Sequence, residues 1–119
     1  MNDKLLSMLG LCRRAGKLIV GNDIAEDSVI NGKAVLVIAA SDASQNTVKK
    51  LFSTAHMCNV KTLVLNRTKD ELGVAVGKYC AVAAIVDAGF AKKVAELAKI
   101  ESEQEDANDK NEKARYRIL

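Results

Sequence analysis

At 119 residues, with 49% hydrophobic and 28% charged residues, the chain is long enough for one folded domain and too short for two. Its formal net charge of +3 is compatible with a polyanionic partner but does not require one, and its three widely spaced cysteines form neither a disulfide framework nor a zinc-ligand pattern. No apolar run approaches the roughly 18 residues of a membrane span and the first residues do not resemble a signal peptide, so we expect a soluble, cytoplasmic protein.

Two helices and a short strand are predicted in the first third of the sequence. Apolar residues recur at helical spacing over 3–15, and the β-branched run that ends 17–20 indicates a brief strand. A second helix is expected over 21–32, with Asp23 and Glu26 forming its N-terminal cap and glycines at both ends. Its inner face is predicted to consist of Ile24, Ala25, Ser28 and Val29.

The middle of the sequence contains the most apolar segment. The uninterrupted run 34–40 predicts a strand buried on both faces, at the centre of a sheet that helices cover on both sides. An amphipathic helix is predicted over 45–57, and 62–65 indicates a second short buried strand.

The last part of the domain repeats the same alternation. Thr68 and Glu71 form a capping box for a helix that continues through Val76 and ends at Gly77. The apolar run 81–86 predicts another strand, and a final helix follows it. That helix is expected to turn inward Phe90, Val94, Leu97 and Ala98. Alternating strands and helices indicate the α/β class, with a small, mostly parallel or mixed sheet of about four strands between helices.

The charge is unevenly divided along the chain. Residues 1–100 carry 14 Lys and Arg against 9 Asp and Glu, whereas residues 101–119 carry 4 against 6 and have almost no apolar content. The sequence therefore predicts one domain over 1–100, followed by a charged tail over 101–119 that is either a frayed helix or disordered.

Signatures of enzymes are absent from the sequence. It contains no GxxxxGK[ST] loop, GxGxxG turn, GxSxG elbow or HExxH helix. The lone His56 is assigned no catalytic role, because isolated histidines are mostly structural or surface residues. Asp42 and Asp87 follow predicted strands, where α/β folds bind ligands, but capping of the next helix is the favoured interpretation. We expect no enzyme, metal, cofactor or small-molecule substrate, and keep an enzyme or nucleotide site on these two aspartates as an alternative.

Several separated motifs occur in the order of a known family. The runs AGKLIVG, NGKAVLVIAASDAS and RTKDELGVAVGKYCAVAAIVDAG resemble the 7Ae/30e superfamily of large-subunit ribosomal proteins, whose members bind kink-turn RNA. The segments LGLCRRAGK, DASQNTVKK and GFAKK look most like the bacterial YlxQ-type proteins of that superfamily. The resemblance covers about residues 4–98. It implies a three-layer α/β/α sandwich, which agrees with the independent analysis of the elements, and a non-enzymatic RNA-binding protein.

The resemblance also implies which residues face the RNA. The first implied surface is the start of the second helix, Gly21, Asn22, Asp23, Ile24 and Asp27, with Lys17 and Lys33 flanking it. The second is the loop Lys78, Tyr79, Cys80, Ala81 and Val82, and the turn at Ser41 and Asp42 lies between the two surfaces. Auxiliary basic contacts are expected from Arg13, Arg14, Lys49 and Lys50. A glycine at position 21 fits, because a residue without Cβ lets RNA approach the backbone.

Two residues depart from the pattern of the kink-turn binders. Ile24 stands where an amide or basic side chain is expected, and Asp27 stands where a lysine would meet phosphate. Replacing a cation by a carboxylate near the RNA backbone should weaken affinity by about 1 to 3 kcal/mol.

The sequence therefore predicts a monomeric protein that binds structured RNA, for example ribosomal RNA, with weakened or altered kink-turn specificity. The alternative is a protein-interaction module that keeps the fold and has lost kink-turn binding.

Overall fold

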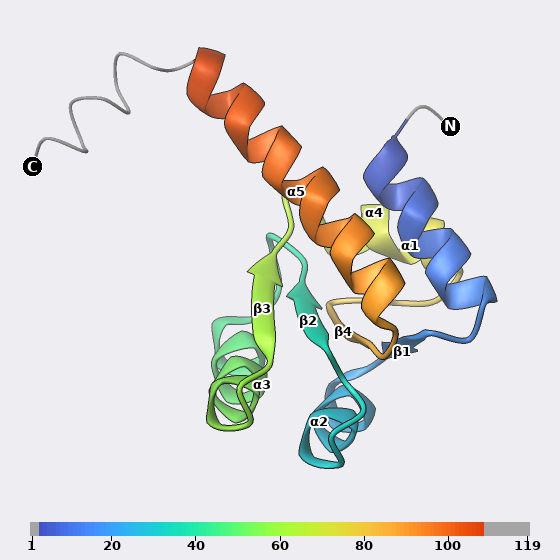
Figure 1. Cartoon of the computed structure of the whole chain (residues 1–119), viewed down its shortest axis with the longest axis vertical. Helices are drawn as coiled ribbons and strands as arrows, with labels where there is room; N and C mark the ends of the chain where they lie inside the picture. The colour runs from blue at the N-terminus through green and yellow to red at the C-terminus, as the bar shows by residue number, and fades with distance from the viewer. Residues whose placement is uncertain (1–2, 109–119) are drawn as a thin grey trace, which may run out of the picture.

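The computed structural model describes residues 3–108 (Figure 1). Along these residues, helices and strands alternate in the order α1 (Lys4–Arg14), β1 (Leu18–Val20), α2 (Asn22–Ile30), β2 (Leu36–Ala39), α3 (Gln45–Met57), β3 (Lys61–Val64), α4 (Lys69–Val76), β4 (Val82–Ile85) and α5 (Ala88–Asn108). The α5 helix continues past the predicted boundary at residue 100, and the rest of the predicted tail, 109–119, lies outside the described residues. No described helix is long and apolar enough to cross a membrane.

The four strands form one mixed sheet in the order β1-β4-β2-β3. The β4 strand is antiparallel to both of its neighbours, with Ile19 opposite Ala84 in β1 and Val37 opposite Ala84 in β2. Only the pair β2–β3 is parallel, with Val37 opposite Thr62. The small mixed sheet is therefore confirmed, and β2 is one of its two central strands.

Helices cover both faces of the sheet and give three layers. One apolar core joins α1, α4 and α5 to the sheet, and a second core joins α2 and α3 to the opposite face (Figure 1). Side chains alternate along β2, so Leu36 and Ile38 enter the first core while Val37 and Ala39 enter the second. This division explains why residues 36–40 are apolar and buried, as predicted, whereas Val35, just before the strand, is exposed. Burial of each large aliphatic side chain contributes about 2 kcal/mol.

The predicted capping box at the start of α4 is confirmed. The Glu71 amide donates to Thr68 Oγ1 at 3.2 Å, and the Thr68 amide donates to Glu71 Oε1 at 2.9 Å. At the other end of the helix, Gly77 has φ of 77°, a left-handed conformation that glycine adopts without strain. Together these residues fix both ends of α4 and the start of the loop that follows.

The strand predicted over 62–65 is present one residue earlier as β3, but the prediction that it is buried is wrong. The β3 strand spans Lys61–Val64, and Val64 is 59% exposed, whereas Leu65 after the strand is buried. The reason is its place in the sheet: β3 lies at an edge and pairs only with β2. The outer side of an edge strand faces solvent, so apolar composition alone does not make it a buried strand.

Two predictions about α2 are also wrong. Its N-cap is Gly21, with φ of 128° and no side-chain hydrogen bond to the helix, rather than Asp23. Ile24 is 56% exposed, and only Ala25, Ser28 and Val29 of the predicted inner face are buried. Because these three have i, i+3, i+4 spacing, they form one narrow stripe, and Ile24 lies outside it.

Arg67 joins three elements that are far apart in the sequence. Its Nε donates to Asp3 Oδ2 at 2.8 Å and its Nη2 to Asp3 Oδ1 at 3.1 Å, while both Nη atoms contact the Glu101 carboxylate. Asp3 also caps α1, because its Oδ1 accepts from the Leu6 amide at 3.0 Å. Through these contacts Arg67 holds the start of α1, the β3–α4 loop and α5 together. Its side chain is 13% exposed, so the site is partly dehydrated. Its hydrogen bonds hold the pKa of Asp3 below the ordinary value of 3.8.

We predict that Arg67→Gln lowers the free energy of unfolding by about 1 to 3 kcal/mol at pH 7, because it leaves two partly buried carboxylates without their cation. The lowered pKa of Asp3 means that its contribution is present above about pH 4 and is lost as the pH falls through the folded-state value. Urea denaturation from pH 7 to pH 2 should therefore show the difference between the two proteins shrinking at low pH. The matched control is Arg14→Gln at an exposed position of α1, which should change stability by less than about 0.5 kcal/mol. Equal effects of both substitutions would contradict this role of Arg67.

A second prediction concerns the three cysteines, all of which are free thiols. Burial raises the pKa of both Cys12 and Cys80 to about 11, so at pH 8 neither is a reactive thiolate. Cys58 is exposed. Iodoacetamide should therefore modify Cys58 alone in the native protein and all three cysteines after unfolding in urea, as peptide mass spectrometry would show. Rapid native modification of Cys12 would mean that the α1 side of the core is open.

Candidate nucleic-acid interface

One end of the sheet collects three of the segments that the sequence singles out. The Gly21 amide donates to the Val82 carbonyl at 3.3 Å, which places the start of α2 beside the start of β4. The Ala40 amide donates to the Ala81 carbonyl at 2.8 Å, which places the turn after β2 against the same loop. We call this end the Gly21 edge and define it as 21–27, 41–50, 69 and 77–79.

The predicted contact residues of α2 and the β2 turn lie on the surface of the Gly21 edge. Those whose side chains are exposed are Asn22, Asp23, Ile24, Asp27, Ser41 and Asp42. Gly21 itself has φ of 128° and no atom within 4 Å of where a Cβ would stand. The backbone at the start of α2 is therefore open to close approach by a ligand.

The predicted loop 78–82 divides into an exposed part and a buried part. Cys80, Ala81 and Val82 are buried in the core, so their side chains are not available on the surface. Lys78 and Tyr79 are exposed, and Tyr79 is the one exposed aromatic residue in the described part of the chain. The Lys78 amide donates to the Gly73 carbonyl at 3.2 Å and ties this part of the loop to α4.

Asp42 connects the β2 turn to α4. Its Oδ1 accepts from the Lys69 amide at 2.8 Å, so Asp42 binds the start of α4 rather than that of α3, the helix that follows it in sequence. The Ser41 amide donates to the Arg67 carbonyl at 2.8 Å, which holds the turn from the other side. These contacts bring Lys69 to the Gly21 edge. This cation is not among the contact residues predicted from the sequence. Its position depends on a contact between residues 27 apart, for which the sequence gives no local signal.

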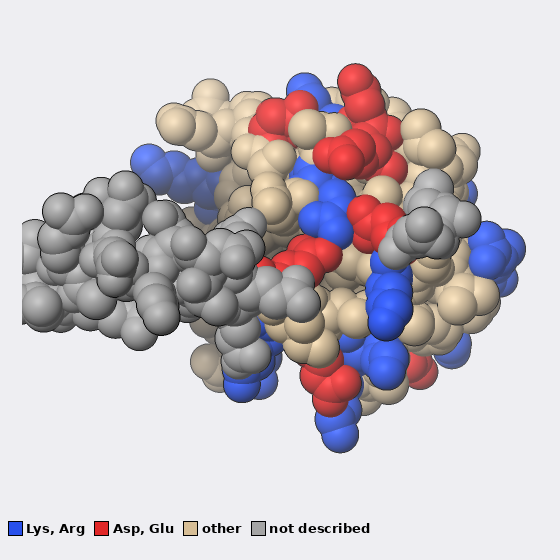
Figure 2. All heavy atoms as spheres, turned by 90° about the horizontal axis from the view of Figure 1, so that it is seen from above, with Lys and Arg blue, Asp and Glu red and all other residues tan. Residues whose placement is uncertain are grey.

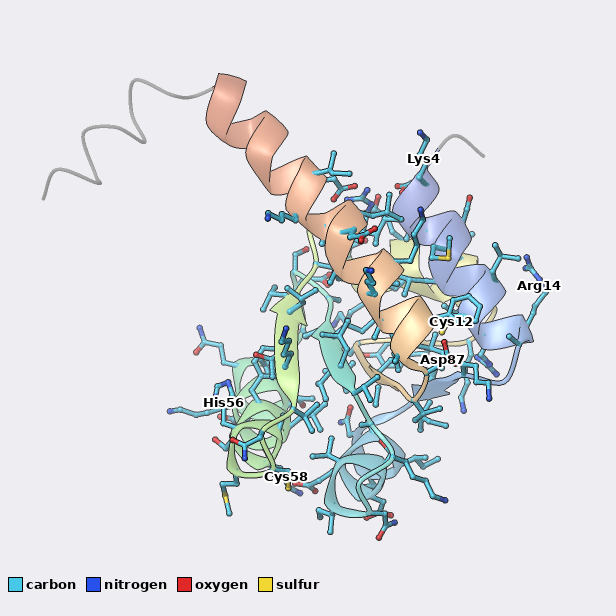
Figure 3. The ribbon with its side chains drawn as sticks, viewed as in Figure 1. Lys4, Cys12, Arg14, His56, Cys58 and Asp87 are labelled. Carbon is cyan, nitrogen blue, oxygen red and sulfur yellow. The ribbon has the colours of Figure 1, made fainter. Side chains whose placement is uncertain are left out.

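Asp87 lies at the opposite end of the sheet from Asp42. Its Oδ2 accepts from the Phe90 amide at 2.9 Å and caps α5, as predicted. Because β2 and β4 are antiparallel, the ends of these strands point in opposite directions, and the two aspartates cannot share a ligand. The alternative of an enzyme or nucleotide site built on both carboxylates is therefore wrong. Figure 3 shows Asp87 near Cys12, and its negative charge adds to the burial that raises the pKa of that thiol.

Lys17 and Lys33 also lie away from the Gly21 edge. The Lys17 carbonyl accepts from the Val86 amide at 3.0 Å, after the end of β4. The Lys33 amide donates to the Ser28 carbonyl at 2.9 Å, in the turn that precedes β2. A four-residue strand spans about 13 Å, so these lysines are separated from Gly21 by the length of the sheet. Lys17 and Lys33 flank the start of α2 in the sequence, but the expectation that they flank it in space is wrong.

The four auxiliary cations have different environments. Arg13 Nη1 donates to the Val76 carbonyl at 3.3 Å and therefore lies at the end of α4, whereas Arg14 is exposed. Lys49 and Lys50 are exposed on α3, and Lys50 Nζ lies 3.8 Å from Glu26 Oε1. At least one of the predicted phosphate-binding cations is thus already paired with an acidic residue of α2.

The charge of the Gly21 edge is mixed. Its acidic residues are Asp23, Glu26, Asp27 and Asp42, and its lysines are Lys49, Lys50, Lys69 and Lys78. Acidic and basic side chains also alternate on the end of the molecule seen from above in Figure 2. The Gly21 edge can therefore offer individual cations and amide groups to a ligand, but not a continuous basic surface.

A hollow of about 260 Å³ lies between the starts of α2 and α3. Asn22 and Asp23 line it from one side and Asn46 and Lys50 from the other. Side-chain amides and carboxylates of this kind can accept and donate hydrogen bonds at the edge of a nucleotide base. The exposed His56 on α3 has its Nε2 atom 3.5 Å from Thr62 Oγ1. The described residues include no group of three or more possible metal ligands.

The sequence and the fold can be compared with those of known proteins. The RNA-binding protein YlxQ of Enterococcus faecium is 40% identical over 94 residues, which are 79% of this chain and 90% of that protein. The YlxQ protein of Bacillus subtilis (strain 168) is 36% identical over 93 residues, 76% of this chain and 90% of that one. The structure of the Giardia lamblia 15.5kD RNA binding protein superposes with a TM-score of 0.68 at 27% identity and covers 86% of this chain and 92% of its own.

The match to a family covers most of the folded part of the chain. Residues 3–95 match the profile of the ribosomal protein L7Ae/L30e/S12e/Gadd45 family. This range includes all four strands and the first turns of α5. The chain therefore belongs to the ribosomal protein L7Ae/L30e/S12e/Gadd45 family, which confirms the resemblance found in the order of its sequence motifs.

Proposed function

We propose that this protein binds structured RNA, for example ribosomal RNA, through the Gly21 edge. The observation that carries the proposal is the convergence of the start of α2, the turn after β2 and the exposed loop residues Lys78 and Tyr79 at one end of the sheet. The names of the YlxQ relatives and of the Giardia lamblia protein, all described as RNA-binding, support RNA binding as such.

The start of α2 supplies the central contacts in this proposal. Gly21 leaves the backbone open, and its lack of a side-chain cap leaves amide groups of the first turn without a side-chain acceptor. Such amides bind phosphate or base acceptors, and the helix dipole favours negative charge there. Asn22 adds a side-chain amide that can bind a base edge. Lys49, Lys69 and Lys78 would contact phosphates around this centre.

Kink-turn recognition is expected to be weakened. Ile24 and Asp27 are both exposed on α2, so both side chains would face an RNA bound there and affect its affinity. Ile24 offers no hydrogen bond to a base, and Asp27 repels phosphate. Glu26 pairs with Lys50, which removes part of that cation's attraction for RNA. Binding would then rely on RNA shape and on backbone contacts more than on the tandem G·A pairs of a kink-turn.

The remaining parts of the proposal follow from the chain itself. The RNA-binding unit is the predicted domain over 1–100 together with the rest of α5, working as a monomer, without a cofactor and without enzymatic activity. Three free cysteines, two of them buried, suit a reducing compartment, and we place the protein in the cytoplasm.

Charge reversal tests which end of the domain binds RNA. Lys78→Glu at the Gly21 edge should weaken binding to structured RNA and reduce the slope of log affinity against log salt by about one, since one phosphate contact is lost. Lys33→Glu is the matched control, because it makes the same charge change at the opposite end of the sheet. Gel-shift titrations at several salt concentrations would measure both variants.

The same titrations decide whether the protein binds RNA or is a protein-interaction module that has lost kink-turn binding. The RNA probes are a standard kink-turn and its variant without the tandem G·A pairs. Similar, salt-sensitive affinities for both are expected. A large preference for the intact kink-turn would contradict the weakened specificity, and no binding to either RNA would favour the protein-interaction module. Equal losses in both lysine variants would contradict the position of the interface.

A gain of affinity is predicted for Asp27→Lys, which restores the cation that the kink-turn binders present. Because it removes a repulsive charge and adds an attractive one, the affinity for the kink-turn should rise roughly tenfold or more, with a steeper salt dependence. Glu96→Lys on the exposed side of α5 changes the net charge equally and should have a much smaller effect. If the two variants gain alike, only overall charge matters and Asp27 does not face the RNA.

A further inference from the structure

The end of the sheet opposite the Gly21 edge carries a hollow of about 560 Å³. Its walls come from the end of α2, the segment before β2, the α3–β3 turn and the first turns of α5. The apolar side chains that line it include Ile30, Val35, Leu36, Val60, Ala91 and Ala95. We call this feature the Lys92 hollow, after the lysine on its α5 wall.

The apolar lining of the Lys92 hollow reaches the surface. Ile30 is 61% exposed and Val35 is 41% exposed, and both belong to the lining. Met57, next to the lining residue Cys58, is 84% exposed. Single exposed apolar residues are ordinary, but exposed aliphatic side chains around a hollow form a continuous surface that a partner can cover.

The charges at the Lys92 hollow are all of one sign. Lys61 and Lys92 line it, and none of its lining residues is acidic. Neither lysine forms an ion pair with another residue in the described part of the chain. An occupant therefore needs apolar side chains for the walls and negative charge for the rim.

The walls are held by backbone hydrogen bonds, so the hollow exists before anything binds. The Val60 amide donates to the Ala55 carbonyl at 2.8 Å, and Asn59 fixes the turn before it with φ of 59°. On the other side, the Val35 amide donates to the Ile85 carbonyl at 2.8 Å. A preformed site loses little conformational entropy on binding.

We propose that the Lys92 hollow binds a segment of another protein that carries aliphatic side chains next to Asp or Glu. The aliphatic walls would take the apolar side chains, and Lys61 and Lys92 would pair with the carboxylates. RNA fits less well, because the lining includes no aromatic side chain on which a base could stack. Since the Gly21 edge lies at the other end of the sheet, such a partner would leave that edge free. This inference does not depend on the proposed RNA binding.

The test uses a phage-displayed library of random 12-residue peptides selected against the full chain, with the enriched peptides resynthesised with a fluorescent label. Enriched peptides should combine aliphatic residues with Asp or Glu. Lys92→Glu should weaken their binding roughly tenfold, measured by fluorescence anisotropy. The matched control is Lys93→Glu, one residue further along α5 and not part of the lining, which should change binding by less than about twofold. Circular dichroism would confirm that both variants are folded.

A second measurement locates the bound peptide. Cys58 is exposed and lines the hollow, so a bound peptide should slow its alkylation. The proposal is overturned if no peptide is enriched, if both lysine variants weaken binding equally, or if Cys58 reacts at an unchanged rate in the complex. It is also overturned if Cys58 becomes protected without peptide as protein concentration rises, which indicates a second copy as the occupant. If no peptide is enriched and the Lys92→Glu variant loses affinity for labelled poly(U), the hollow would be assigned to nucleic acid instead.

Discussion

The antiparallel insertion of β4 between β1 and β2 is the constraint on which the rest of the structure depends. It turns the end of β1, the end of β2 and the start of β4 toward the same side, so segments from three parts of the sequence meet at the Gly21 edge. The same pairing sends the start of β2 and the end of β4 to the opposite side, where the Lys92 hollow lies. Ala83 and Ala84 of β4 are completely buried, and their small side chains let helices pack closely on both faces.

The Gly21 edge combines an open backbone at Gly21 with side chains of mixed charge. Gly21 is the N-cap of α2, and the Arg67 carbonyl supports the neighbouring turn by accepting from the Ser41 amide. At positions 24 and 27, where a basic side chain would attract phosphate, the chain has the apolar Ile24 and the acidic Asp27. Geometry and electrostatics are therefore separable here: the fold brings the segments of the Gly21 edge together, while in our proposal individual side chains set how strongly and how selectively RNA binds.

Local patterns were sufficient to predict the order of the elements and the α/β class. The uninterrupted run 34–40 and the capping box at Thr68 are signals carried within a few neighbouring residues, and both correspond to what the structure contains. Errors arose where position in the sheet decides the outcome. Val64 is apolar and exposed because β3 is an edge strand, and strand order cannot be read from the composition of a single strand.

The residues of the candidate site were harder to predict from local sequence patterns, because their positions depend on how distant segments pair. Lys17 and Lys33 bracket α2 in the sequence, yet the antiparallel pairing of β4 carries them away from its start. Lys69 reaches the Gly21 edge only through the contact of its amide with Asp42, which no local motif announces. The burial of Cys80 likewise depends on how the loop packs on the core, so the motif does not indicate which residues of that loop are exposed.

Ultraviolet crosslinking of the full chain to a bound structured RNA, followed by mass spectrometry of the crosslinked peptides, tests the central claim most directly. The account predicts crosslinks in the peptides that contain the start of α2, the turn after β2 and the loop at Lys78 and Tyr79. Peptides that contain Lys33 or Lys92, at the other end of the sheet, should remain free of RNA. Crosslinks confined to those latter peptides would contradict the assignment of RNA binding to the Gly21 edge.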